Sequence, residues 1–138
     1  MRGHPFNARS GTKRSSSYIN VTDYPDINDL ILASDIGVMD YSSLRFDYAL
    51  TGKPTFYFVP DLERYFDGRE SFAPYEDTSP GPHVRTMQEL VDGIRVAERV
   101  AADFEQARQR FLATFMELED GHAAERLVDA VFVPRGDA

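Results

Sequence analysis

Apolar positions between residues 18 and 59 alternate between short runs and helically spaced stripes. Three short runs carry β-branched or aromatic residues and are predicted as strands: residues 18–22, 36–39 and 54–59. Helical spacing between them predicts one helix that opens at Pro25 or Asp26 and a second over residues 42–51, with Gly52 as its stop. This alternation predicts an α/β fold with a parallel, partly complete Rossmann-like sheet.

From residue 60 onward the sequence no longer alternates between predicted strands and helices. Residues 60–85 are predicted as an ordered loop with one short helix around 62–66, and the pattern from residue 86 onward is helical. We expect a single domain over residues 1–138, made of a basic segment and loop (1–17), an α/β core and loop (18–85) and a helical tail (86–138). Because a doubly wound domain usually has five or six strands, three strands indicate part of a larger protein.

Composition narrows the possible functions. Hydrophobic residues make up 42% and charged residues 28% of the chain, as in an ordinary globular protein. The net charge is −8, which argues against nonspecific binding of nucleic acid. Four of the 15 basic residues and none of the acidic ones lie in residues 1–22. This basic segment could bind a small anion such as phosphate, or it could be a solvated chain end without a ligand. With no cysteine, disulfides and thiolate metal sites are excluded.

The stretch between the second predicted strand and the next helix carries the candidate chemistry. Asp40 lies at the carboxyl end of the strand, where ligands bind in parallel α/β sheets. Ser42 and Ser43 fall at the start of the helix, where backbone N–H groups and hydroxyls can bind phosphate; the alternative is that Ser42 only caps the helix. Asp47, four residues after Ser43, could accept hydrogen bonds from a ligand hydroxyl or could be a solvent-exposed acid.

Arg2 and His4 form a second candidate at the N-terminus. Arg can bind phosphate, and His can donate a proton to a leaving phosphate or act as a base, although a lone His is more often structural. No Gly-rich phosphate loop occurs, and no His/Asp/Glu cluster has metal-ligand spacing. We therefore predict no metal site; Asp40 is expected to accept backbone N–H bonds instead of binding a metal with Asp47.

Several motifs together resemble one family. Residues 34–65, "SDIGVMDYSSLRFDYALTGKPTFYFVPDLERY", are followed by Arg69 and by "PGP" at residues 80–82. They resemble the C-terminal part of the CDP-glycerol glycerophosphotransferases, the teichoic-acid polymerases and primases of bacteria. "MRGHP" at the start is similar to that family's R-x-H segment, and "DGHAAERLVDAVF" (120–132) to its closing helix.

The resemblance implies a two-domain GT-B enzyme whose C-terminal domain binds CDP-glycerol. It implies donor contacts from Arg2, Gly3 and His4, from Ser42 and Ser43, and from Asp47, with His4 catalytic at the diphosphate. The implied reaction transfers glycerol phosphate to a hydroxyl of a lipid-linked polymer, without metal or cofactor, at the inner face of the bacterial cell membrane. The family's further histidine lies in an "HGT" segment of the preceding half, which this chain lacks, so we expect the isolated chain to be inactive.

Two other hypotheses stay open at this point. The donor could be CDP-ribitol or a sugar nucleotide on the same architecture. Alternatively, the chain could be a noncatalytic nucleotide-binding remnant.

Overall fold

The computed structural model describes residues 18–69 and 71–132, which fall in two compact units, residues 1–34 and 35–138. In the first unit, helix α1 (Ile27–Ala33) begins after Asp26, whose side chain accepts a hydrogen bond from the backbone N–H of Asn28 (2.8 Å). This is a regular N-cap. The helix therefore begins where the sequence predicts.

The prediction of a strand at residues 18–22 is wrong. Tyr18 makes an isolated bridge, and the chain turns at Thr22 and Asp23. The side chain of Asn20 accepts hydrogen bonds from the backbone N–H (3.0 Å) and the hydroxyl (2.7 Å) of Thr22. Such local bonds give the backbone an alternative to a strand ladder, and here they outweigh the β propensity of the segment.

A three-stranded parallel sheet lies in the second unit, as the sequence predicts for an α/β fold. Its strands, in spatial order, are β1 (Gly37–Met39), β2 (Thr55–Phe58) and β3 (His83–Val84). The register pairs Met39 with Tyr57, and Tyr57 with His83. The first two strands match predictions, whereas β3 lies in the stretch predicted as a loop.

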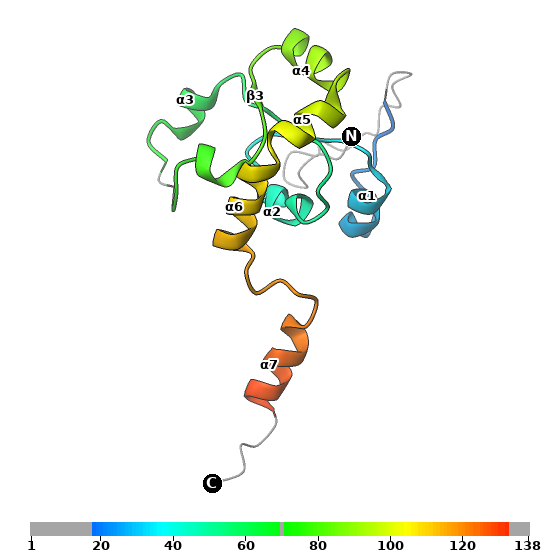
Figure 1. The fold of residues 1–138 in the computed structure, drawn as a ribbon, viewed down its shortest axis with the longest axis vertical. Helices are drawn as coiled ribbons and strands as arrows, with labels where there is room; N and C mark the ends of the chain where they lie inside the picture. Colours follow the sequence, from blue (N-terminus) through cyan, green and yellow to red (C-terminus); the bar gives the residue numbers. More distant parts are fainter. Residues whose placement is uncertain (1–17, 70, 133–138) are drawn as a thin grey trace. The chain divides into compact units, whose positions relative to one another are not determined.

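Helices connect and flank these strands (Figure 1). They are α2 (Leu44–Ala49), α3 (Leu62–Phe66), a 3-10 turn (Glu76–Thr78), α4 (Met87–Ile94), α5 (Ala97–Asp103), α6 (Glu105–Phe115) and α7 (Ala123–Val131). Helix α2 packs against β1 and α6, whereas α4 packs against β2 and β3. The short helix α3 lies where the sequence predicts one.

The side chains of the central strand divide between the two faces of the sheet. Phe56, fully buried, packs with Val84 and Leu90 on the face that α4 covers. Tyr57, between Phe56 and Phe58, points to the other face, where its ring meets that of Tyr75 edge-on (6.1 Å). Burial of each such aromatic side chain contributes about 2 kcal/mol, so this packing stabilises the short strands.

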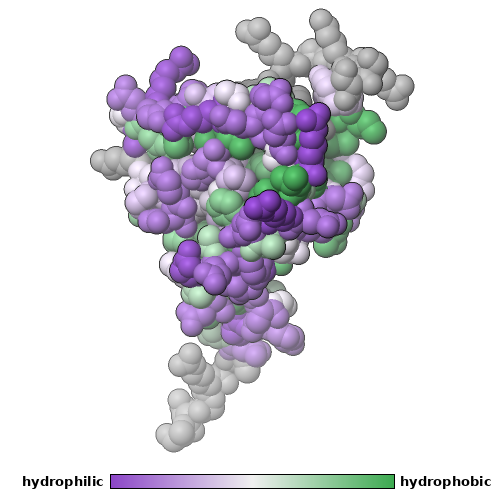
Figure 2. Space-filling model, turned by 45° about the horizontal axis from the view of Figure 1, so that its top comes forward, coloured by the Kyte–Doolittle hydropathy of each residue, from purple (hydrophilic) through white to green (hydrophobic). Residues whose placement is uncertain are grey.

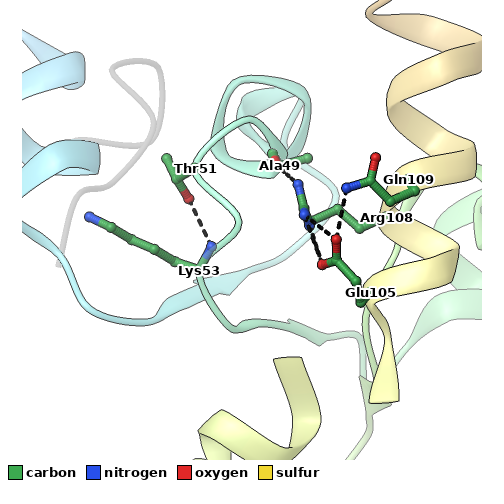
Figure 3. A network of polar contacts seen from close by, with 6 residues as sticks. All are labelled: Ala49, Thr51, Lys53, Glu105, Arg108 and Gln109. Carbon is green, nitrogen blue, oxygen red and sulfur yellow. Dashed lines mark hydrogen bonds and ion pairs between the residues drawn. The ribbon is translucent and has the colours of Figure 1, made fainter. Parts of the chain in front are cut away.

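An arginine on α6 fixes the C-terminal end of α2 (Figure 3). Arg108 donates to the carbonyl of Ala49 (3.3 Å) and makes a bidentate ion pair with Glu105 (2.6 and 2.7 Å), which also accepts a hydrogen bond from Gln109. The hydrogen bond from Arg108 lowers the pKa of Glu105. Carbonyls at a helix end lack partners within the helix, so this contact satisfies one of them.

Hydrophilic residues cover most of the face shown in Figure 2, with smaller hydrophobic patches between them. Helix α7 also exposes a hydrophobic stripe, formed by Leu127, Val128 and Val131. Within residues 18–69 and 71–132, no helix is both long enough and apolar enough to span a bilayer.

Candidate functional site

Side chains of the turn that joins β1 to α2 hydrogen-bond to the backbone of the same segment. Asp40 accepts a hydrogen bond from the backbone N–H of Ser42 (3.0 Å), as the sequence predicts for this carboxylate. The hydroxyl oxygen of Ser42 in turn accepts from the N–H of Leu44 (3.2 Å). Ser43 occupies the N-cap position but makes no side-chain cap bond. The side chain of Ser42 thus satisfies the first N–H of the helix, and the exposed hydroxyl of Ser43 is left for another partner.

Most backbone N–H groups at the start of α2 already have hydrogen-bond acceptors, whereas the sequence pattern predicts that they are free for a ligand. Besides the N–H of Leu44, those of Arg45 and Phe46 donate to the carbonyls of Ser42 (3.4 Å) and Ser43 (3.0 Å). Among the described residues, none accepts a hydrogen bond from the N–H of Ser43. The donors that remain for a ligand are this N–H and the two serine hydroxyls, so the hydroxyls carry most of the site's binding capacity.

Arg45 lies beneath the turn and holds its carbonyls. The residue is only 8% exposed, and its side chain donates to the carbonyls of Tyr41 and Ser42, both at 3.0 Å. It also donates to the hydroxyl of Thr78 (3.2 Å), which belongs to the 3-10 turn. With its carbonyls held from inside, the turn presents its hydroxyls at the surface.

The guanidinium of Arg45 has no carboxylate partner among the described residues. It lies over the rings of Phe46 (5.0 Å) and Tyr75 (5.2 Å), and its Nε atom is buried without a hydrogen-bond acceptor. Stacking on two rings compensates part of the desolvation of the charge. The positive charge also lies close to where an anion would meet the serines, which favours a negatively charged ligand.

Two tyrosines fix the turn from the side. The hydroxyl of Tyr75 donates to the carbonyl of Asp40 (2.8 Å), and the hydroxyl of Tyr41 donates to Asp61 (2.7 Å). The ring of Tyr41 stacks on that of Tyr65 at 3.5 Å between centroids. Burial raises the pKa of Tyr75 to about 12, and burial together with the bond to Asp61 raises the pKa of Tyr41. Both phenols therefore stay protonated as donors at neutral pH.

Of the other predicted site residues, the structure describes Asp47 alone. Asp47 lies in the first turn of α2 with an exposed side chain, so its carboxylate is accessible to a ligand. Arg2, Gly3 and His4 lie outside the described residues. In the described part of the chain, no group of His, Cys, Asp or Glu is arranged to hold a metal ion.

Sequence reasoning missed Arg45, Tyr75 and Thr78. Arg45 falls between apolar residues of a predicted helix and looks like an ordinary surface arginine. The other two residues lie in a stretch predicted as a loop, 30 and 33 positions after Arg45 in the chain. A basic residue three positions after Ser42 was the available signal, because that spacing brings a side chain back to the start of its own helix.

Comparisons with known proteins identify the family of this chain. Residues 1–133 match the family described as CDP-Glycerol:Poly(glycerophosphate) glycerophosphotransferase. The chain belongs to this family. The resemblance inferred from the sequence motifs is thereby confirmed, and so is the assignment to a family of transferases.

Curated relatives of this glycerophosphotransferase-family chain act on teichoic acid. The chain is 37% identical over 114 residues to the teichoic acid glycerol-phosphate transferase of Staphylococcus aureus, covering 82% of this chain and 29% of that protein. It is 33% identical over 135 residues to the teichoic acid poly(ribitol-phosphate) polymerase of Bacillus spizizenii, covering 96% and 21%.

The fold has a solved counterpart. The structure of the wall teichoic acid polymerase TagF aligns with a TM-score of 0.72 and 29% identity, over 81% of this chain and 28% of TagF. The predicted Rossmann-like arrangement is supported by this similarity. The chain spans less than a third of the length of each of these proteins.

Proposed function

We propose that this chain supplies the donor-binding part of a glycerophosphotransferase that moves glycerol phosphate from CDP-glycerol to a teichoic-acid-like polymer. The observation that supports it is the turn at residues 40–43, where Ser42 and Ser43 expose hydroxyls above the buried guanidinium of Arg45. Hydroxyl donors next to a positive charge favour a diphosphate. A variant of TagF has also been solved after a soak with CDPG.

The proposed reaction is a phosphoryl transfer. A terminal hydroxyl of the acceptor attacks the β-phosphorus of CDP-glycerol and gives its proton to a base that the preceding half would supply. A new phosphodiester bond forms, the diphosphate bridge breaks and CMP leaves with the bridging oxygen. Ser42 and Ser43 would hold the diphosphate in position, and Asp47 would accept a hydroxyl of the ribose or glycerol. His4 would stabilise charge on the departing CMP. The acceleration would come from positioning and charge stabilisation.

The partners follow from the same proposal. The acceptor would be a lipid-linked polyol phosphate, and a preceding GT-B half would supply the rest of the active site, with the chain acting as the C-terminal, donor-binding domain of the two. The assembled enzyme would work at the inner face of the cell membrane. Nucleic acid is not expected as a partner because the chain carries a net charge of −8.

Ribitol is the second candidate for the donor's polyol. The similarity to a poly(ribitol-phosphate) polymerase extends over 96% of this chain, more than the similarity to the glycerol-phosphate transferase. The two donors share the CDP moiety and the diphosphate, so the turn at residues 40–43 would serve both.

Calorimetric titration of the full chain with CDP-glycerol, CDP-ribitol and a UDP-sugar tests the proposal. We expect CDP-glycerol to bind, and the double variant Ser42→Ala/Ser43→Ala to lose about 1–3 kcal/mol of binding free energy, because both hydroxyls contact a charged group. Thr114→Ala, which removes an exposed hydroxyl on α6, is the control and should bind as the wild type does. Preference for the UDP-sugar, or unchanged affinity in the folded double variant, would contradict the proposal.

A further inference from the structure

An open groove of about 600 Å³ lies beside the turn, and the proposed donor site does not use it. We call it the α3 groove. The residues that matter for its chemistry are Glu63, Phe66, Arg69, Phe72, Tyr75 and Arg85. They come from α3, from the segment that follows it and from the carboxyl end of β3.

Two arginines give the groove its capacity for anions. Arg69 is exposed, stacks on the ring of Tyr65 at 4.3 Å, and has no ion-pair partner among the described residues. Arg85 is held by Glu63 through two hydrogen bonds (2.6 and 3.1 Å), and its side chain is 49% exposed. Glu63 and Glu76 also line the groove, so its two arginines are matched by two carboxylates; because Arg85 is paired with Glu63, Arg69 is the unpaired guanidinium among the described lining residues.

The rest of the groove suits a polyol. The aromatic side chains of Phe66, Phe72 and Tyr75 line it, and that of Phe72 is 73% exposed. Aromatic faces pack against C–H groups, and the carboxylate of Glu76, also in the lining, can accept hydrogen bonds from hydroxyls. A molecule that alternates phosphate, C–H and hydroxyl groups matches this combination better than a purely anionic or purely apolar ligand.

Two residues that line the α3 groove contact the turn at residues 40–43. Tyr75, which lines the groove, donates its hydroxyl to the carbonyl of Asp40. The ring of Phe66, on the other side, meets the ring of Tyr41 edge-on at 5.9 Å. A chain lying in the groove would therefore be next to the turn that carries the proposed diphosphate site.

We infer that the α3 groove binds a poly(polyol phosphate) segment, the part of the acceptor behind its reacting end. This inference rests on the proposed function, because the relatives' polymers are poly(glycerol phosphate) and poly(ribitol-phosphate). Arg69 and Arg85 would contact successive phosphodiesters, and the aromatic residues would contact the polyol between them.

Binding of a synthetic glycerol-phosphate oligomer by the full chain tests the inference. We expect Arg69→Gln to weaken binding about three- to tenfold, because one charged contact is lost. Arg64→Gln is the matched control: Arg64 is exposed on α3, five residues before Arg69, but does not line the groove, and its variant should bind as the wild type does. Phe72→Ala should also weaken binding, through loss of the aromatic contact. Circular dichroism would verify that each variant is folded.

Titration with CDP-glycerol separates this inference from the proposed function. We expect Arg69→Gln to bind CDP-glycerol with unchanged affinity. Equal weakening of oligomer binding by Arg64→Gln and Arg69→Gln would overturn the inference, because it indicates nonspecific attraction. It would also be overturned if the wild type binds CDP-glycerol but no oligomer, or if Arg69→Gln loses the donor. Failure to bind CDP-glycerol while the oligomer binds would instead contradict the proposed function alone.

Discussion

The amino ends of the parallel strands, which form the amino edge of the sheet, and their carboxyl ends, which form the carboxyl edge, are stabilised by different interactions. At the amino edge, glycines allow close packing: a Cβ on Gly37 would lie 2.8 Å from the ring of Tyr48, and one on Gly81 would lie 2.5 Å from the carbonyl oxygen of Thr55. At the carboxyl edge, side chains with hydroxyl and charged groups fill the turn and leave donors exposed. Steric fit therefore determines the first edge, and hydrogen bonding determines the second.

The two arginines that hold the ends of α2 show the same contrast. Arg108, at the amino edge of the sheet, is neutralised by Glu105 and donates to a helix carbonyl (Figure 3). Arg45, at the carboxyl edge, keeps its charge without a carboxylate partner among the described residues. A buried charge that is not neutralised costs stability, so it is expected where binding of an anion needs it.

Gly81→Ala tests the packing of the amino edge and should have the largest effect. The new Cβ would meet backbone, which cannot rotate away, so we expect a loss of about 3 kcal/mol in the free energy of unfolding. Chemical denaturation measures it. Gly68→Ala, at a glycine with φ of +69° and nothing within 4 Å, should lose about 1 kcal/mol from backbone strain alone. Equal losses in the two variants would contradict close packing at Gly81.

Arg45→Met tests the hydrogen bonding of the carboxyl edge. Two turn carbonyls and the hydroxyl of Thr78 would lose their donor, and we expect a loss of about 2 kcal/mol in the free energy of unfolding. CDP-glycerol binding should weaken as well, because the turn is no longer held. Arg110→Met, an exposed position on α6, is the control for both measurements. If CDP-glycerol binds Arg45→Met as tightly as the wild type, Arg45 does not position the turn.

A smaller effect is expected from His83, in strand β3. Burial lowers the pKa of His83 below its ordinary value of 6.5, and its ring hydrogen-bonds to Ser79 (2.7 Å). The unfolded chain then binds a proton at a higher pH than the folded one does. Stability from His83 is therefore complete above pH 6.5 and decreases as the pH falls from 6.5 through the folded value.

Denaturation at pH 7.5 and pH 5.5 measures this contribution. The wild type should lose more stability between the two pH values than His83→Gln does. An equal loss would mean that His83 does not contribute to the pH dependence.

The sequence predicted the regions where local patterns and tertiary structure agree. The strands around Val38 and Phe56 and the helix between them were found because short apolar runs, helical spacing and a glycine stop are local signals, although α2 (Leu44–Ala49) is shorter than the predicted range of 42–51. Strand β3 was missed because it has two residues and follows a Pro-Gly-Pro segment, so it exists only through its pairing with β2. The burial of Arg45 likewise depends on Tyr75 and Thr78, distant in the chain, which no local pattern reveals.

Amide chemical-shift mapping with CDP-glycerol tests the central claim most directly, because it observes both edges of the sheet at once. We predict that the amides of Ser42, Ser43 and neighbouring residues of the turn shift on titration, whereas those of Gly52 and Gly81 at the opposite edge do not. Shifts concentrated at Gly52 and Gly81, with the turn unchanged, would contradict the claim that the donor's diphosphate binds at the carboxyl edge.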